Sequence, residues 1–462
     1  MNIYKNLNKI YVFTLLIITL IIFYRFIGDY NFKFNNLNLF LSYLFLITSV
    51  SFIYIFFKFN IKDNQFPLFP LIILYLIFAY GFSFELINFH LITQKQSVIT
   101  KAYLVMNIGI ILFGIGFFVS KNFLKRKKEL NLLEFKNFNF ILFFGLSLVL
   151  INILDKIIQI LPNNLNQIHQ PTISMGCAII FYYFIFSNKI YKFIYIIPVI
   201  IIIFLEILKS SYVYPATILL QYFLIYIILK KKLPLVQLLL FFLFFVFLHS
   251  FKLEFRDYLS KSKNLQAHDR TEIFLNVYNF NNFKKRQIDG HSRNRSEDNF
   301  WRITHSYTSL LKIVEKSPDQ VPFYYGETYK ILLTKFIPRI FWEDKPSDEY
   351  ANSVGRRYDV LGKDDRNTSW NFPILNETYA NYGFYGVFFI MLSLGILVRI
   401  LTNLFSINNF NNFESFIGVY ICSTAFFWEP HLSLVFGGLH LVILFLYVIT
   451  IFFSLIIKKI II

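Results

Sequence analysis

No charged residue interrupts the stretch Gly386-Val-Phe-Phe-Ile-Met-Leu-Ser-Leu-Gly-Ile-Leu-Val398, and apolar runs of this kind recur along the chain. Many of them are about 20 residues long, which is the length of a helix that crosses a bilayer. The sequence of 462 residues is 56% hydrophobic and only 16% charged. We therefore expect an all-α, polytopic membrane protein with about twelve transmembrane helices.

The expected helices are joined by short loops, except at one place. Their centres lie near Ile18, Ile47, Tyr75, Ile108, Leu148, Ile180, Ile200, Leu224, Phe242, Met391, Tyr420 and Leu446. Polar residues between Asn188 and Tyr212 predict that the sixth to eighth helices are short. A large polar insert follows the ninth helix. It divides the chain into a membrane region of residues 1–251, the insert of residues 252–376 and a second membrane region of residues 377–462.

Basic residues gather in alternate loops, which indicates the orientation of the chain. Lys and Arg beside a membrane span are retained on the cytoplasmic side. They concentrate at both ends of the chain and in every second short loop. Both termini are therefore expected in the cytoplasm, and the insert is expected outside it. The formal net charge of +18 follows from this topology, so it predicts no nucleic-acid partner.

Two amphipathic helices are expected in the second half of the insert. The first ends at Ser317-Pro318 and has apolar residues at helical spacing, namely Ile303, Tyr307, Leu310, Leu311 and Val314. The second begins near Gly326-Glu327, must end before Pro338, and has an apolar face formed by Tyr329, Leu332, Leu333 and Phe336. Both helices would lie at the membrane surface.

Cations and one carboxylate follow the second amphipathic helix. Arg339 comes directly after Pro338 and close to Trp342, and an exposed cation beside an interfacial aromatic residue is well placed to meet a lipid headgroup. Lys345 adds a second cation next to a proline. Glu377 lies at the outer mouth of the next span, where a carboxylate needs a partner or a function.

Several motifs occur in order through the insert and into the next span. They are Trp301-Arg302, Gly326-Glu-Thr-Tyr329, Ile337-Pro-Arg339, Trp342, Lys345-Pro346, Glu377-x-Tyr379-x-Asn381-x-Gly383 and Gly386. This ordered set, which covers about a third of the chain, resembles the oligosaccharide repeat-unit polymerases of the Wzy type, which build O-antigen and related polysaccharides. The chain departs from the family pattern at Glu343-Asp344, and its Asn-rich segment before Trp301 has no counterpart there.

The resemblance implies an extracytoplasmic glycosyltransferase in the inner membrane of a bacterium. Its partners would be glycans linked to polyprenyl diphosphate, as donor and as acceptor, together with membrane lipids and a chain-length regulator. The growing chain would move from its carrier lipid to the terminal sugar of an incoming repeat unit, and the carrier diphosphate would be released. No cofactor and no metal is expected, because basic side chains would neutralise the diphosphate.

This chemistry gives roles to the cations and to the carboxylate. A departing diphosphate gathers negative charge, so Arg339 and Arg302 are expected to be catalytic by stabilising the transition state. Glu377 is expected to be the general base that deprotonates the acceptor hydroxyl, with Asp257 in reserve. Substrate binding is expected of Arg256, Lys345, Trp342, Tyr379, Asn381, Arg356 and Arg357.

Several of these residues also have a purely structural interpretation. Arg339 would serve equally well as an anchor to phosphate headgroups, and Glu377 would cap the start of a helix. Gly383 and Gly386 are more typical of close helix packing than of substrate contact. Three histidines lack the spacing of metal ligands and are interpreted as ordinary polar residues, namely His249, His305 and His431.

Two other functions remain open at this stage. An O-antigen ligase would use the same donor and a similar topology, with a sugar of the lipid A core as its acceptor. A flippase or transporter for the lipid-linked glycan should carry charged residues inside its spans and an internal repeat. The sequence has few acids near its spans, namely Glu85, Asp155 and Glu206, and it has no evident repeat.

Overall fold

The computed structural model is helical throughout the parts of the chain that it describes, apart from turns and short connections, and this confirms the all-α prediction. The described residues are 3–28, 36–60, 66–81, 95–123, 138–158, 166–188, 190, 192–210, 212–232, 234–261, 267–278, 305–335, 337, 342, 344, 350–366, 368, 370–405, 413–425, 428–437, 439, 442–449 and 451.

The helices follow one another with short connections between most of them. In chain order they are α1 (Ile3–Gly28), α2 (Asn36–Asn60), α3 (Leu68–Leu76), the π-helix η2 (Ile77–Gly81), α5 (Gln96–Val119), the 3-10 helix η3 (Ser120–Asn122), α6 (Phe138–Ile158), α7 (Asn166–Phe186), α8 (Lys192–Ile207), α9 (Val213–Lys230), α10 (Leu235–Lys261), α11 (Ala267–Val277), α14 (Glu327–Thr334), α15 (Tyr350–Arg357), α16 (Ile374–Leu404), α17 (Phe413–Ala425) and α18 (Leu432–Phe436). Residues 305–316 and 442–449 form two further helices.

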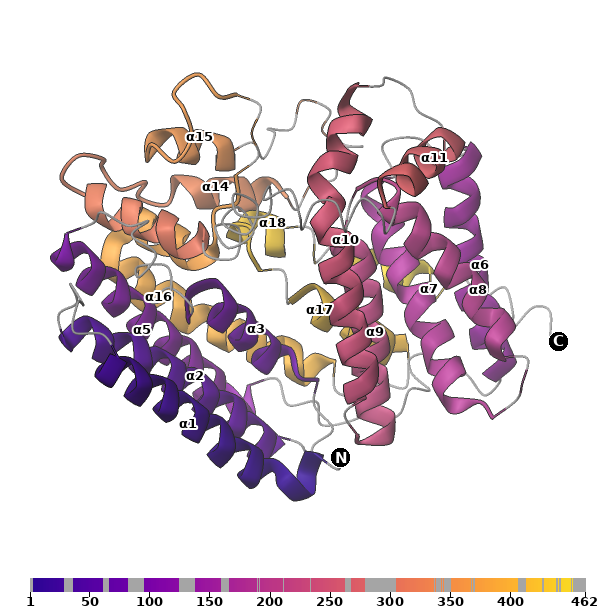
Figure 1. Cartoon of the computed structure of the whole chain (residues 1–462), viewed down its shortest axis with the longest axis horizontal. Coiled ribbons are helices and arrows are strands. Elements are labelled where there is room, and N and C mark those ends of the chain that lie inside the picture. Colours follow the sequence, from indigo (N-terminus) through magenta and orange to yellow (C-terminus); the bar gives the residue numbers. More distant parts are fainter. Residues whose placement is uncertain are drawn as a thin grey trace.

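One bundle contains α1, α2, α3, α5 and α16, at the lower left of Figure 1. Its most extensive contact joins α5 to α16. Glycines make that contact close, because a Cβ atom on Gly116 would lie 2.2 Å from the Leu392 carbonyl oxygen, and one on Gly395 would lie 2.1 Å from the Phe113 carbonyl oxygen. Small residues at such crossings let two backbones approach, which is how apolar helices gain packing energy without a hydrophobic driving force between them.

A second bundle contains α6, α7, α8 and α9, at the right of Figure 1. The crossing of α6 and α7 again depends on glycine, since a Cβ atom on Gly176 would lie 2.8 Å from the Gly145 carbonyl oxygen. α17 packs against α7 and α9 and also against α3, so it joins the two bundles. Both cysteines, Cys177 on α7 and Cys422 on α17, are buried in this packing.

Five helices among the described residues are long and apolar enough to cross a membrane, judged by length and composition. They are Leu37–Phe59, Gln96–Asn122, Asn139–Ile158, Val213–Lys230 and Ile374–Leu404. These helices are compatible with a membrane protein. The prediction of about twelve transmembrane helices is wrong on this finding.

Most of the other expected spans do not meet the criteria of length and composition within the described residues. Apolar helices of 10–17 residues cover Ile10–Leu20, Leu68–Gly81, Leu235–Leu248 and Ser415–Ala425. α8 has only 16 residues, and α7 has a polar first turn and contains Pro171. An apolar run alone does not separate a membrane span from a short helix that packs inside a protein, because both environments favour the same side chains.

The first of the two expected insert helices is buried inside the protein. It covers residues 305–316, and the side chains of Tyr307, Leu310 and Leu311 are fully buried. The Tyr307 ring lies 5.6 Å from that of Tyr103 on α5. The second expected helix is α14, which begins at Glu327 and ends before Pro338 as predicted. α14 and α15 lie above α16 in Figure 1.

Candidate functional site

A break inside α16 provides the acceptors that hold the insert. Gly383 and the residue before it have non-helical dihedral angles, and the φ of Gly383 is +59°. Glycine adopts this backbone conformation without the strain that a side chain would cause. The carbonyl groups of Ala380 and Asn381, just before the break, accept hydrogen bonds from the backbone N–H groups of Tyr324 and Tyr325, each at 3.0 Å. The break in α16 therefore fixes the chain that leads into α14.

Asn381 ties α14 to α16 through its side chain. Its Nδ2 donates a hydrogen bond to Thr328 Oγ1 at 2.8 Å, and its Oδ1 accepts one from the Gly326 backbone N–H at 3.0 Å. Asn381 and Thr328 are 53 residues apart in the sequence. A buried amide is costly unless its donors and acceptors are satisfied, and here both ends of the amide have partners.

Asn376 connects the start of α16 to the buried helix of residues 305–316. Its Nδ2 donates to the Ser306 carbonyl oxygen at 2.8 Å and to Ser309 Oγ at 2.7 Å. Its Oδ1 accepts a hydrogen bond from the Tyr80 hydroxyl at 2.8 Å. The first turns of α16 are thus the point at which three separate parts of the chain meet.

Glu377 is fully buried in the first turn of α16. Its Oε2 accepts a hydrogen bond at 2.7 Å from the backbone N–H of Leu432, the first residue of α18. Negative charge is favourable at a helix start, where N–H groups have no helical partner. Burial and, secondarily, the charge of Glu377 raise the pKa of Tyr329 well above its ordinary value, so that phenol stays protonated. In this arrangement Glu377 positions α18.

A second carboxylate close to α16 is accessible to solvent. Glu429 Oε1 lies 3.2 Å from His305 Nε2, and the two side chains are 35% and 21% exposed, respectively. His305 begins the helix whose next residue, Ser306, is bound by Asn376. Glu429 belongs to the segment between α17 and α18, which also carries the buried His431. Glu429 is therefore a carboxylate that is both paired with an imidazole and open to solvent.

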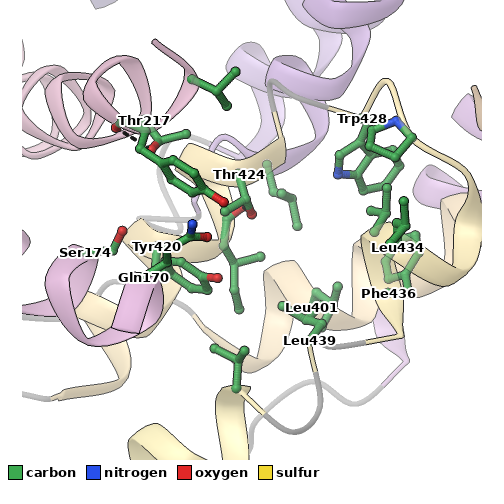
Figure 2. A pocket seen from close by; sticks show the side chains of 17 residues that line it. Gln170, Ser174, Thr217, Leu401, Tyr420, Thr424, Trp428, Leu434, Phe436 and Leu439 are labelled. Carbon is green, nitrogen blue, oxygen red and sulfur yellow. Dashed lines mark hydrogen bonds between the residues drawn. The ribbon is translucent and has the colours of Figure 1, made fainter. Parts of the chain in front are cut away.

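The same segment borders a cavity of about 320 Å³ (Figure 2). Figure 2 shows a polar side, with Gln170, Ser174, Thr217, Tyr420 and Thr424, and an apolar side that includes Leu401, Leu434 and Leu439. Its walls come from α3, α7, α9, α16, α17, α18 and the residues that follow α18. The cavity therefore lies where α17 joins the two bundles.

A charged cluster lies at the ends of α6, α7 and α8. Lys156 forms an ion pair with Glu206, and the two side chains are 10% and 7% exposed. The neighbouring pair is His169 Nδ1 with Asp155 Oδ2 at 3.3 Å. Desolvation and the charge of Lys156 lower the pKa of Lys209 beside them. The acids Asp155 and Glu206 thus have basic partners close by.

A family model described as a domain of unknown function, DUF8712, matches residues 67–462. The chain belongs to the DUF8712 family. The match begins just before α3, so it includes the α16 network, the cavity and the charged cluster. No curated protein and no solved structure matches the chain.

In this DUF8712 chain, three expected site residues lie outside the described residues, namely Arg302, Arg339 and Lys345. The side chain of Asp257 lies outside them too. Of the others, Arg256 is exposed on α10 and Trp342 is half-buried.

Three expected residues are brought together on the first two turns of α16, namely Glu377, Tyr379 and Asn381. The Tyr379 ring is buried, with its centre 6.1 Å from that of Phe323, and Lys101 Nζ lies 5.7 Å from the Tyr379 ring centre. All three side chains contact other parts of the protein, so these residues help to hold the insert of residues 252–376 in place.

The two expected arginines of α15 also bind the protein. Arg357 lies over the Tyr324 ring at 4.0 Å and donates from Nη2 to the Pro322 carbonyl oxygen at 2.6 Å. Arg356 donates from Nη1 to the Asp365 carbonyl oxygen at 3.0 Å. Burial raises the pKa of Tyr324 to about 12, although Arg357 acts in the opposite direction.

The sequence interpretation missed the cavity of the DUF8712 chain and the pair of Glu429 with His305. One signal for the pair was present, because Trp428-Glu-Pro-His431 is a polar, proline-containing interruption between apolar stretches. Polar residues between apolar segments of a membrane protein are costly unless they have a function or a partner. Nothing comparable marked the cavity, whose polar residues come in pairs from three separate helices, α7, α9 and α17.

Proposed function

We propose that the protein is an extracytoplasmic glycosyltransferase that polymerises oligosaccharide repeat units carried on polyprenyl diphosphate. It would act in a bacterial inner membrane, with both termini in the cytoplasm and the insert outside. Its substrates would be two lipid-linked glycans, one as donor and one as acceptor. The sequence motifs that suggested this function are distributed over a long insert. The proposal is therefore supported first by motifs that lie far apart in the sequence and are in contact in the structure.

The observation that carries the proposal is the meeting of two of these motifs. Gly326-Glu-Thr-Tyr329 opens α14, and Glu377-x-Tyr379-x-Asn381 opens α16. Hydrogen bonds from Asn381 to Thr328 and from Gly326 to Asn381 join the two motifs directly. A polar assembly is thereby built at one end of an apolar helix, as a transferase acting at a membrane surface requires.

The proposed reaction exchanges one bond to the anomeric carbon for another. The acceptor hydroxyl oxygen attacks the anomeric carbon of the donor glycan, and the bond from that carbon to the diphosphate oxygen breaks. The hydroxyl proton passes to a base on the protein. The electron pair of the broken bond leaves with the carrier diphosphate, which is already a good leaving group and needs no general acid.

Two carboxylates compete for the role of base. Glu377 is fully buried and holds α18 through the Leu432 N–H. Glu429 is 35% exposed and pairs with His305, so an acceptor hydroxyl can reach it without rearrangement of α18. General base catalysis requires contact with the proton that is removed. We therefore assign the base to Glu429 and a positioning role to Glu377.

The cations of the insert complete the proposed site. Arg339 and Arg302 keep the role of stabilising the leaving diphosphate, because guanidinium groups bind phosphate oxygens in pairs. Lys345 and Arg256 would add to the positive field. Arg356 and Arg357 hold the loop around α15 through backbone carbonyl groups, so they support the insert and contribute less to substrate binding.

The test is polymerisation by the purified protein in liposomes supplied with polyprenyl-diphosphate-linked repeat units. The wild-type protein should produce a ladder of glycan lengths. Glu429→Gln should lower the rate by about a hundredfold or more, the range for loss of a general base. Arg339→Ala should lower it by roughly a hundred- to a thousandfold, as for loss of one donor to a developing negative charge.

Matched controls separate these effects from loss of charge in general. Glu315→Gln changes a carboxylate on the helix that carries His305, and Arg366→Ala removes an exposed guanidinium of the insert. Both variants should keep the ladder. If the wild-type protein transfers glycan to a lipid A core sugar and makes no ladder, a ligase replaces the polymerase. If Glu429→Gln keeps the full rate, Glu429 is not the base.

A further inference from the structure

The polar wall of the cavity combines side chains from three helices. α7 contributes Gln170 and Ser174, α9 contributes Tyr214 and Thr217, and α17 contributes Tyr420 and Thr424. All of these side chains are uncharged hydroxyls or amides. No lysine, arginine, aspartate or glutamate belongs to the described lining of the cavity. The wall can therefore exchange hydrogen bonds but offers no charge to an ion.

Several of these polar groups have capacity left for a ligand. Thr217 Oγ1 donates to the Tyr214 carbonyl oxygen at 2.7 Å, and Thr424 Oγ1 donates to the Ile421 carbonyl oxygen at 2.9 Å. Each hydroxyl oxygen still has lone pairs to accept a bond. The hydroxyls of Ser174 and Tyr420 make no hydrogen bond with any other described residue. A ligand can thus meet both donors and acceptors on this wall.

The opposite wall is apolar. It is formed by Leu68 of α3, Leu401 of α16, and residues of α18 and beyond, namely Leu434, Val435, Phe436, Leu439 and Val442. Trp428 contributes an aromatic ring, which packs edge-on against Phe436 with a centre distance of 5.1 Å. Figure 2 shows the two walls facing each other across the cavity.

The chemistry of the two walls indicates which part of a lipid-linked glycan fits the cavity: the polyprenyl tail, the diphosphate or a sugar. A polyprenyl tail would offer no hydrogen-bond partner to the hydroxyls of Ser174 and Tyr420, and a buried polar group without a partner is costly. A diphosphate would find no cation in the described lining. A neutral sugar presents hydroxyls at its edges and C–H groups on its faces, so it matches a polar wall opposite an apolar one. The volume of about 320 Å³ is at the lower end of the usual range for ligand pockets.

We propose that this cavity binds one neutral sugar unit of the glycan substrate, with its hydroxyls on the wall of α7, α9 and α17. This inference rests on the proposed glycosyl transfer and specifies where part of the substrate lies. The cavity shares the segment from Trp428 to Phe436 with the proposed base, Glu429. A sugar held there would lie beside the carboxylate that removes the acceptor proton.

The direct test measures binding in the absence of any reaction. The full-length protein is placed in lipid nanodiscs, and saturation-transfer NMR is recorded with the methyl glycosides of glucose, galactose, mannose, rhamnose and N-acetylglucosamine. At least one should bind to the wild-type protein. Tyr420→Phe and Ser174→Ala should each weaken its binding by about 5- to 10-fold, which corresponds to loss of one hydrogen bond.

Matched variants outside the cavity provide the controls. Tyr226→Phe lies on α9 away from the cavity, and Ser393→Ala lies on the exposed side of α16. Both should bind the sugar like the wild-type protein. The proposal is overturned if none of the five glycosides binds, or if the cavity variants bind as tightly as the controls. It is also overturned if polyprenyl monophosphate, which has no sugar, competes fully with the glycoside.

This design separates the cavity from the proposed function. Sugar binding that depends on Tyr420 and Ser174, in a protein that makes no polymer, would support the sugar site and refute the polymerase. A glycan ladder from the wild-type protein, together with an unchanged KM for the repeat unit in Tyr420→Phe and Ser174→Ala, would refute the sugar site alone. The unfolding midpoint of each variant should equal that of the wild-type protein, because no bond to the protein is removed.

Discussion

Three buried polar residues at the start of α16 join separate segments of this fold. Asn376, Glu377 and Asn381 occupy the first two turns of α16, and each binds a different segment of the chain. Their side chains are fully buried, so every bond replaces a bond to water that was lost. Sequence analysis predicted a catalytic role for Glu377 and a substrate-binding role for Asn381, and it gave no site role to Asn376. The contacts assign it first to the assembly of the insert.

The buried pair of Lys156 and Glu206 allows a prediction for single residues. Glu206→Leu should destabilise the folded protein by about 3–5 kcal/mol, because it leaves the Lys156 charge buried without a partner. The double variant Lys156→Met with Glu206→Leu should recover most of that loss, since neither charge remains. The measurement is the free energy of unfolding in detergent, analysed as a double-mutant cycle.

A surface ion pair serves as the control for this cycle. Lys316 and Asp359 also form an ion pair, but the Asp359 side chain is 60% exposed. The hydrogen bond from Lys316 and, secondarily, its charge lower the pKa of Asp359, and water screens the pair. Asp359→Asn should therefore change stability far less than Glu206→Leu. A double variant no more stable than Glu206→Leu alone would contradict the role given to the unpaired lysine.

Among the elements, α16 determines how the insert meets the bundle. Its break at Gly383 presents two backbone carbonyl groups to the chain before α14, and its first turn holds α18. The bounds of α14 were predictable, because Gly326 and Pro338 limit a helix from both sides. The break in α16 was not, since glycine is also common in membrane helices for close packing and the sequence does not separate the two uses.

Gly383→Ala should therefore destabilise the junction between α14 and α16. The φ of +59° is unfavourable for a residue with a side chain, at a cost of about 1–3 kcal/mol, and the new Cβ would lie 2.9 Å from the Phe323 ring. The expected result is a lower unfolding midpoint, together with faster proteolysis within the insert. The matched control is Gly362→Ala, because a Cβ atom there would have nothing within 4 Å. Equal behaviour of the two variants would show that the break tolerates a side chain.

For the whole molecule, the sequence was sufficient to predict the all-α class but not to predict the number of membrane spans. Long runs such as that of α16 were recognised because their length alone indicates a bilayer crossing. Shorter apolar helices, such as Leu68–Gly81 and Ser415–Ala425, are packed between other helices. Their side chains are as apolar as those of a membrane span, so the sequence does not separate the two. The cavity was beyond prediction because its six polar residues become neighbours only when α7, α9 and α17 pack together.

The proposed orientation can be tested on the whole molecule by thiol labelling. Cys177 and Cys422 are both buried, so a membrane-impermeant maleimide should react little with the wild-type protein in intact cells. Lys363→Cys, at an exposed position of the insert, should be labelled from outside the cell. Lys230→Cys, at the exposed end of α9, should be labelled only after the membrane is permeabilised. The reverse pattern would place the insert in the cytoplasm.

The hydrogen bond between Leu432 and Glu377 connects the start of α16 to a helix that borders the cavity. Leu432 begins α18, and three residues of that helix, from Leu434 to Phe436, are part of the cavity wall. A bond to a charged carboxylate is about twice as strong as one to a neutral group. Neutralising Glu377, by a proton or by a bound cation, would therefore weaken this hydrogen bond. The cavity wall formed by α18 would then be freer to move outward.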